Sequence, residues 1–220
     1  MSADLRLYAL VDPERAGGRD LADLASQLAS GGATLVQLRD KLDSTRSMVE
    51  TARRIRGRLS PLGVPLLVND RADVAFAAGA DGVHLGQDDM AVEDARRLLG
   101  PHAVIGLSIK TLDQAANAAL AHLDYVCVGG VFATTSKDNP DPPIGIAGLK
   151  SILARVRTRD ADIPIGAIAG IDAGNAAAVI GAGADGVAVI SALSLASDPQ
   201  AAARDLRAIV EAALARRQAA

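Results

Sequence analysis

The chain has 220 residues, of which 50% are hydrophobic and 22% charged, and its 23 Lys and Arg against 26 Asp and Glu leave a formal net charge of −3. This length and composition predict a single globular domain over residues 1–220 with a substantial core. With no Trp, two Tyr and two Phe, the chain has neither aromatic surfaces for stacking bases nor a basic footprint for phosphate backbones. We therefore expect small molecules, and no nucleic acid, as its partners.

No hydrophobic run approaches the roughly 20 residues that a membrane-spanning helix needs, because charged residues interrupt each run. The segment 1–10 carries Asp4 and Arg6 and lacks a basic start followed by a long apolar block, so no secretory signal is predicted. The single cysteine, Cys127, lies between two valines and has no partner for an internal disulfide. These features predict a cytoplasmic protein with no membrane partner.

Short β-branched or Leu-rich runs alternate with amphipathic, Ala-rich stretches along the whole chain, which is the pattern of parallel β-α units. Eight strands are predicted, beginning near Leu5, Thr34, Pro65, Gly82, Val104, Tyr125, Ile163 and Gly186. A helical pattern follows each strand. Eight such units predict an α/β fold, a compact (β/α)8 TIM barrel with eight parallel strands.

The second predicted strand ends in a file of polar and cationic residues. In TLVQLRDK, the side chains of Gln37, Arg39 and Lys41 share one face by the two-residue period of a strand. An exposed edge strand would explain these charges as solvated, but a closed barrel has no edge strand, and inward charge needs a ligand or a partner. We therefore favour a cationic file that faces the mouth of the barrel.

Acidic residues end the next two strands. The third strand ends in Asn69 and Asp70, and the fourth, GVHLGQDD, ends in Asp88 and Asp89. Neighbouring strands lie roughly 4.8 Å apart, and carboxylates with substrate phosphate oxygens are the usual ligands of Mg²⁺, so Asp70 and Asp89 are the predicted metal pair. Capping of the following helix is the alternative for either, and it suits Asp88 best. His84 is either a hydrogen-bonded structural residue or a substrate contact.

The fifth strand, VIGLSIKT, places Ser108 near its C-terminal end. No G-x-S-x-G turn surrounds Ser108 and no histidine is placed to activate it, so hydrogen bonding is expected and nucleophilic attack is not. The longest irregular stretch, 131–146, follows the sixth strand and contains Thr134, Ser136 and Lys137. It is the candidate substrate loop or lid.

After the seventh and eighth strands, GAIAGIDAGN and GVAVISAL turn into helices. In TIM barrels these two loops frequently bind phosphate. Gly170 would let the backbone approach a ligand closely, and N–H groups around Ile190 and Ser191 would point at an anion. Packing alone also produces glycine-rich strand ends, but the chain as a whole indicates two anionic subsites. One would use the cationic file, Lys137 and Mg²⁺ for a diphosphate, and the other would hold a monophosphate.

The pentapeptide GADGV occurs twice, over 79–83 and 183–187, which suggests an internal half-barrel repeat. We assign Asp81 and Asp185 a structural role, because the turn before a strand lies at the end of the barrel away from the chemistry. The Ala-rich stretch 201–213 could pack on a second subunit, so a homo-oligomer is compatible with the sequence.

In chain order, QLRDK, VND, ADGVHLGQDD, GLS, FATTSK, AGI and AVISAL resemble the thiamine phosphate synthase family over almost the whole chain. That family is a (β/α)8 barrel that joins 4-amino-2-methyl-5-pyrimidinylmethyl diphosphate to a carboxylated thiazole phosphate, giving thiamine phosphate, diphosphate and carbon dioxide. The resemblance implies an Mg²⁺-assisted transferase of thiamine biosynthesis. It also implies a dissociative reaction, in which diphosphate leaves first and the thiazole nitrogen captures the pyrimidinylmethyl cation.

The resemblance also implies a set of site residues. The pyrimidine diphosphate would be held by Gln37, Arg39, Lys41 and Asn69. The departing diphosphate would be contacted by Ser108 and Lys137, which with Arg39 and Lys41 make up the expected catalytic residues. Asp70 and Asp89 would bind Mg²⁺. The thiazole phosphate would be held by Thr134, Ser136, Gly170, Ile190 and Ser191.

Two positions depart from the family pattern. Lys110 stands where the family often has a histidine, and it could add a cation near the diphosphate or face solvent. Ala169 replaces the first residue of a Gly-Gly turn, and we expect this to change fine geometry only, because Gly170 retains the second glycine. The alternative functions are a thiazole tautomerase-like barrel and a non-catalytic barrel that binds thiazole phosphate. The cationic file favours the synthase, because a tautomerase has no diphosphate to bind.

Overall fold

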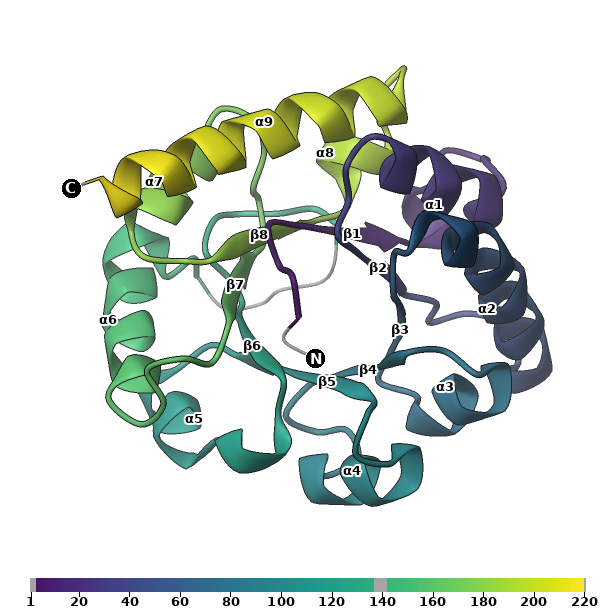
Figure 1. Cartoon of the computed structure of the whole chain (residues 1–220), viewed down its shortest axis with the longest axis horizontal. Coiled ribbons are helices and arrows are strands. Elements are labelled where there is room, and N and C mark those ends of the chain that lie inside the picture. Colours follow the sequence, from purple (N-terminus) through teal and green to yellow (C-terminus); the bar gives the residue numbers. More distant parts are fainter. Residues whose placement is uncertain (1–2, 137–141, 220) are drawn as a thin grey trace.

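The computed structural model describes residues 3–136 and 142–219. Within these ranges, eight parallel strands pair in chain order, and β1 pairs with β8 to close the barrel (Figure 1). The strands are β1 Leu7–Val11, β2 Leu35–Leu38, β3 Leu66–Asn69, β4 Gly82–Leu85, β5 Val104–Ile109, β6 Tyr125–Val128, β7 Ile165–Ile168 and β8 Gly186–Val189. The predicted (β/α)8 barrel is confirmed, and each strand begins within two residues of its predicted start.

Helices surround the barrel in an outer ring, and the long α9 lies beside α7 and α1 (Figure 1). The α-helices are α1 Leu21–Ser30, α2 Thr45–Leu59, α3 Ala72–Ala78, α4 Val92–Leu99, α5 Leu112–Asn117, α6 Gly145–Arg157, α7 Ala176–Gly181, α8 Ser191–Ser194 and α9 Pro199–Gln218. Short 3-10 turns are η1 Pro13–Arg15, η2 Ser60–Leu62 and η3 Leu120–His122. Among the helices of the described ranges, none has the length and apolarity that crossing a bilayer requires.

Two apolar layers follow from the alternation of side chains along the strands. In β2, Val36 and Leu38 pack outward in the layer between barrel and helices, whereas Leu35 and Gln37 lie inside. The interior layer consists of Leu5, Tyr8, Leu10, Leu35, Leu67, Tyr125, Cys127, Ala188 and Ile190. The filled interior leaves the polar residues at the strand ends as the floor of the mouth.

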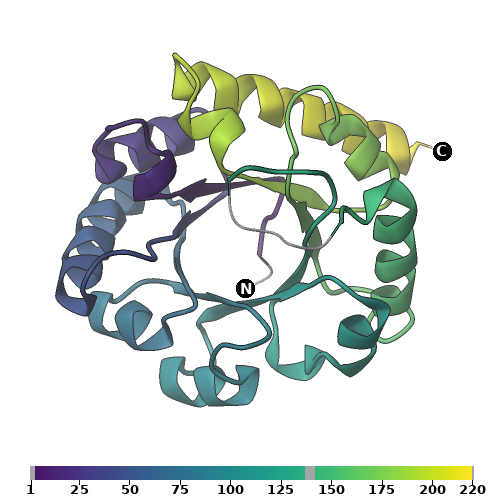
Figure 2. The same ribbon diagram turned by 180° about the vertical axis from the view of Figure 1, so that it is seen from behind.

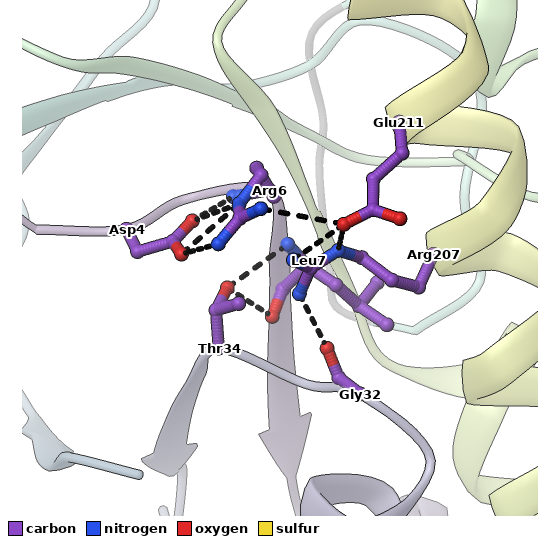
Figure 3. A network of polar contacts seen from close by, with 7 residues as sticks. All are labelled: Asp4, Arg6, Leu7, Gly32, Thr34, Arg207 and Glu211. Atoms are coloured by element: carbon purple, nitrogen blue, oxygen red, sulfur yellow. Dashed lines mark hydrogen bonds and ion pairs between the residues drawn. The ribbon is translucent and has the colours of Figure 1, made fainter. Parts of the chain in front are cut away.

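A polar network joins the N-terminal segment, the turn before β2 and α9 at the N-terminal end of the barrel (Figure 3). Arg6 donates hydrogen bonds to Asp4 and, at 3.3 Å, to Glu211. Arg207 donates to Glu211 and to the carbonyl of Gly32, each at 2.8 Å. Burial by itself raises the pKa of Asp4, but the hydrogen bonds and charge of Arg6 outweigh it, so the pKa is lowered overall. The network therefore fixes this end of the barrel without using a catalytic residue.

The aspartates of the two GADGV segments accept hydrogen bonds from the strands that lie beside them. Asp81 accepts a hydrogen bond from the first N–H group of β3, and Asp185 accepts one from the first N–H group of β7, both at 2.8 Å. Asp124, which lies outside any GADGV segment, makes the same kind of bond to β5 at 2.8 Å. Their structural role agrees with the prediction, but the contact is general to the turns that enter strands and does not single out a half-barrel repeat.

Candidate functional site

Two adjoining cavities open at the C-terminal end of the barrel. The first, of about 40 Å³, is lined by Tyr8, Leu10, Gln37, Arg39, Asn69, His84, Ser108, Cys127, Ile168 and Ile190. The second, of about 260 Å³, lies between the loops after β6, β7 and β8 and is lined by residues 133–136, 168–172 and 188–192. Ile168 and Ile190 line both cavities, so the two cavities share a wall.

The cationic file lies at the mouth as predicted, and each of its cations meets a carboxylate. Arg39 forms an ion pair with Asp12, whose side chain is 1% exposed. Asp12 also accepts a hydrogen bond from the N–H of Glu14 at the start of η1. Lys41, which is about half exposed, pairs with Asp70. The pairs hold the cationic groups in place, and a buried anchor such as Asp12 makes the position of Arg39 the more firmly fixed of the two.

The two predicted metal ligands lie close enough to influence each other. Asp70 follows β3 in a left-handed backbone conformation, with φ of 62°, and its N–H donates to the carbonyl of His84 at 2.7 Å. Burial raises the pKa of the Asp70 carboxyl and the neighbouring Asp89 raises it further, while Lys41 opposes both, so the pKa is raised overall. Asp89 accepts a hydrogen bond from the N–H of Gly86 at 2.7 Å. Two carboxylates are thus held at one point of the mouth.

The alternative that these aspartates cap helices is wrong. Within the described residues, the N-cap positions of α3 and α4 are Arg71 and Ala91, and neither helix has a side-chain capping hydrogen bond. Asp88 is exposed on the turn between β4 and α4, and it does not cap α4 either. Helix capping therefore does not explain the left-handed backbone conformation of Asp70.

The donor set fits a metal ion that a substrate helps to bind. Asp70 and Asp89 offer carboxylate oxygens, which Mg²⁺ prefers, and Mg²⁺ commonly takes one or two carboxylates and completes its shell with phosphate oxygens and water. Across residues 3–136 and 142–219, no group of three or more His, Cys, Asp or Glu residues forms a cage of protein ligands alone. The pair therefore suits Mg²⁺ bound together with a phosphorylated ligand.

His84 is a buried, hydrogen-bonded residue that also lines the first cavity. Its Nδ1 lies 2.8 Å from the hydroxyl of Tyr125, and its Nε2 lies 2.9 Å from Oγ of Ser108. The expectation that no histidine is placed beside Ser108 is therefore wrong, because β4 and β5 are neighbours in the sheet and bring the two side chains together. The hydroxyls of Tyr125 and Tyr8 are 2.9 Å apart, and Nε2 of Gln37 donates to the Tyr8 hydroxyl. Ser108 and Gln37, both predicted as substrate contacts, are thereby joined through the barrel interior.

The second cavity gathers the residues predicted for the thiazole phosphate, namely Thr134, Ser136, Gly170, Ile190 and Ser191. The hydroxyl of Thr134 accepts from the N–H of Ser136 at 3.1 Å, and the hydroxyls of Ser136 and Ser191 are 2.7 Å apart. Arg15 of η1 donates to the carbonyl of Ser136 at 3.4 Å. Figure 2 shows this segment after β6 lying over the C-terminal face of the barrel, next to the loop that follows β8.

The turn after β7 corrects one expectation. Gly170 has a φ of 63°, and a Cβ there would lie 2.3 Å from the carbonyl oxygen of Ala133, so glycine is required by the neighbouring loop and not only by a ligand. Ala169, at the first position of this turn, also has a positive φ, of 95°, so the residue that replaces glycine there adopts a conformation that glycine would adopt more readily. Its Cβ makes that conformation costly.

The predicted roles of two lysines, Lys137 and Lys110, stay untested. Lys137 lies outside the described residues. Lys110 is half-buried with its side chain beside Gly130, and both of its predicted roles stay open. The sequence pattern did not single out Asp12, Tyr8 or Tyr125, although Asp12 directly follows β1 and so lies at a strand end like the predicted residues.

A larger cavity, of about 700 Å³, opens at the N-terminal end of the barrel. Its charged residues include Asp4, Asp81 and Arg207, and each is engaged in a structural contact of that end. The size of a cavity therefore does not identify the candidate site. The polar residues at the strand ends of the opposite face do. In TIM-barrel enzymes the active site lies at that C-terminal face.

Known proteins match this chain over nearly its whole length. A family model described as thiamine monophosphate synthase matches residues 7–193. The chain is 53% identical to the thiamine-phosphate synthase of Agrobacterium fabrum over 215 residues, covering 98% of each chain. It is 48% identical over 208 residues to that of Albidiferax ferrireducens, covering 94% of this chain and 93% of the relative. A solved thiamine phosphate pyrophosphorylase from Pyrococcus furiosus superimposes with a TM-score of 0.83 at 36% identity, covering 96% and 98% of the two chains.

Proposed function

Because the chain belongs to the thiamine monophosphate synthase family, we propose that it joins 4-amino-2-methyl-5-pyrimidinylmethyl diphosphate to a carboxylated thiazole phosphate. The products are thiamine phosphate, diphosphate and carbon dioxide, so the enzyme is a transferase of thiamine biosynthesis. The observation that carries the proposal is the shared wall of the two cavities, formed by Ile168 and Ile190. Two phosphorylated reactants can meet there.

The diphosphate substrate lies in the mouth next to the cationic file. Arg39 and Lys41 supply positive charge from the end of β2, and Ser108 supplies a hydroxyl from β5. Gln37 and Asn69 line the same cavity and face the pyrimidine ring. Lys137 adds a further cation to the departing diphosphate. Opposite charge in a partly dry mouth stabilises a leaving group more strongly than the same charges would in water.

Asp70 and Asp89 hold Mg²⁺ in this proposal. When bound, Mg²⁺ neutralises part of the charge that develops on the leaving diphosphate. Burial and the neighbouring carboxyl of Asp89 raise the pKa of Asp70, and Lys41 opposes both. Lys41, which pairs with Asp70, supplies positive charge at the same point.

The second reactant occupies the cavity between the loops after β6, β7 and β8. Its phosphate takes hydrogen bonds from the hydroxyls of Thr134, Ser136 and Ser191 and from backbone N–H groups around Gly170 and Ile190, all of which line that cavity. The contact between the hydroxyls of Ser136 and Ser191 holds the two loops together around the ligand.

The reaction needs no protein nucleophile. The bond between the pyrimidinylmethyl carbon and the diphosphate oxygen breaks with its electron pair on the diphosphate. The thiazole nitrogen then donates its electron pair to the cationic carbon. The bond between the thiazole ring and its carboxylate breaks with the electron pair kept by the ring, which releases carbon dioxide. The protein contributes alignment of the two reactants and charge stabilisation of the leaving group.

The proposal is tested by incubating the protein with both substrates, or with each alone, in Mg²⁺ or in excess EDTA, and measuring thiamine phosphate by thiochrome fluorescence. Product that requires both substrates and Mg²⁺ supports it. Isomerisation of the thiazole phosphate without coupling would favour a tautomerase, and binding without conversion would favour a non-catalytic barrel. We place the enzyme in the cytoplasm, where its single, buried Cys127 stays reduced.

A further inference from the structure

The segment between β1 and α1, residues 12–20, contacts two of the loops that form the second cavity. It contains the 3-10 turn η1 and two half-buried arginines, Arg15 and Arg19. Among the described residues, those that line the two cavities of the mouth include neither arginine. Each arginine instead donates hydrogen bonds to main-chain carbonyl groups of one loop, so the segment holds the cavity walls from outside.

Arg15 holds the end of the loop that follows β6. Its guanidinium donates to the carbonyl of Thr135 and, at 3.4 Å, to the carbonyl of Ser136. Nearer β6, main-chain hydrogen bonds to the turn after β7 hold the same loop. Within the part of the chain that the structure describes, the hydrogen bonds that join residues 134–136 to other segments come from Arg15 and from the hydroxyl of Ser191.

Arg19 holds the loop that follows β8. It donates to the carbonyls of Ser194 and Ala196, at 2.9 and 2.8 Å. Ser194 is the last residue of α8, is fully buried and donates its hydroxyl to the carbonyl of Ile190 at 2.9 Å. Ser191, the first residue of α8, lines the second cavity. Arg19 therefore fixes the short helix that carries this hydroxyl.

The segment that carries the two arginines is itself fixed to the barrel. Asp12, the N-cap of η1, is 1% exposed, and its carboxylate accepts from the N–H of Glu14 at 2.9 Å. The N–H of Arg15 donates to the carbonyl of Asp12 at 2.9 Å. Ala16, which follows η1, is buried as well. Both guanidinium groups therefore extend from one rigid turn.

This arrangement sets the distance between two walls that are remote in sequence. The loop after β6 and the loop after β8 meet where the hydroxyls of Ser136 and Ser191 lie 2.7 Å apart. A guanidinium presents several N–H donors in a fixed planar geometry, so one arginine can hold two carbonyl groups at once. Because both arginines belong to the same turn, the two walls share one support.

We propose that Arg15 and Arg19 are positioning residues for the second reactant, which hold the loops after β6 and β8 at the spacing that a phosphate group between them requires. The proposal rests on the proposed function and deepens it, because it assigns part of the affinity for thiazole phosphate to residues outside the cavity. The affinity for the pyrimidine diphosphate does not depend on these two side chains.

The first test measures dissociation constants of thiazole phosphate and of the pyrimidine diphosphate separately by calorimetry. In Arg15→Gln and in Arg19→Gln, the constant for thiazole phosphate should rise about fivefold to tenfold, and the constant for the pyrimidine diphosphate should stay unchanged. Arg15→Lys keeps one charged donor group and should recover part of the affinity that Arg15→Gln loses.

Arg159→Gln is the matched control. Arg159 also donates to two main-chain carbonyls, those of Ala115 and Ala118, each at 2.8 Å. The variant should lower thermal stability, because it removes contacts of the same kind, and should leave both dissociation constants unchanged.

The second test needs no substrate. The N–H of Ser136 donates to the hydroxyl of Thr134 at 3.1 Å, so its hydrogen exchange reports on the order of this part of the loop. In the ligand-free protein, Arg15→Gln should speed the exchange of this amide, and Arg159→Gln should not.

The outcomes separate this proposal from the proposed function. A wild-type dissociation constant for thiazole phosphate in either Arg15→Gln or Arg19→Gln would overturn the positioning role. Equal weakening of both substrates, or the same selective loss in Arg159→Gln, would also overturn it, because a merely structural role predicts these results. If the wild type binds both substrates and forms no thiamine phosphate, the proposed function is refuted, while a selective loss in the two variants still supports the positioning role.

Discussion

Replacing Asp70 by Asn separates the chemistry of this position from its backbone conformation. Asp70 has a φ of 62°, a region that Asn and Asp adopt more readily than other residues with a side chain. Asp70→Asn therefore keeps the backbone and removes the charge. Asp70→Ala removes the same charge, but alanine has no polar side chain to offset the cost of the left-handed conformation.

The expected magnitudes differ between activity and stability. Loss of one of two metal carboxylates should lower kcat/KM at least about 100-fold, or roughly 3 kcal/mol of transition-state stabilisation, in both variants. The left-handed conformation costs an ordinary residue about 1–2 kcal/mol, which corresponds to a melting temperature roughly 2–8 °C lower for Asp70→Ala than for Asp70→Asn. In EDTA, Asp70→Asn should be at least as stable as the wild type, because burial and Asp89 disfavour the charge of Asp70.

The assay pairs thiochrome kinetics over a Mg²⁺ series with thermal melts in EDTA. Asp88→Asn, at an exposed position next to Asp89 in the turn between β4 and α4, is the matched control and should retain wild-type kinetics. An Asp70→Asn variant with wild-type activity would refute the metal assignment. Activity losses that follow the melting temperatures of the three variants would show that Asp70 matters for folding alone.

Three further changes test other parts of the structure. Ser191→Ala removes a hydroxyl 2.7 Å from Ser136, so steady-state kinetics should show a KM for thiazole phosphate raised about tenfold and an unchanged KM for the pyrimidine substrate. Ala169→Gly removes the strain of a φ of 95° at some cost in chain entropy and should raise the melting temperature by a few degrees, about 1–4 °C; a lower value would contradict the strain. Arg6 lowers the pKa of Asp4, so the stability that Asp4 contributes is present above its ordinary pKa of about 3.9 and is lost as pH falls through the lowered value; melts of Asp4→Asn and wild type should differ at pH 6 and coincide near pH 2.

The barrel could be predicted because its determinants are local. The two-residue period of TLVQLRDK placed Gln37 and Arg39 on the inner face, and the same rule kept Val36 and Leu38 outside, as the structure shows. Closure of the sheet then brought the ends of β2, β3 and β4 together. The position of Asp70 beside Lys41 and Asp89 follows from that neighbourhood.

The remainder depends on contacts that no local pattern encodes. The pairing of Tyr8 with Tyr125 joins residues 117 positions apart and arises from the register of strands on opposite sides of the barrel. The requirement for glycine at position 170 comes from the carbonyl of Ala133 in another loop. The positive φ of Ala169 likewise reflects how its loop is held by the fold, since alanine itself disfavours that conformation.

The most direct test of the central claim is a time course that follows both products of one reaction. With both substrates and Mg²⁺ present, ³¹P NMR should show thiamine phosphate and diphosphate appearing in equal amounts, and neither product should form in EDTA. Release of diphosphate without an equal amount of thiamine phosphate, or no release from folded wild-type protein, would contradict a mouth in which two phosphorylated reactants are joined.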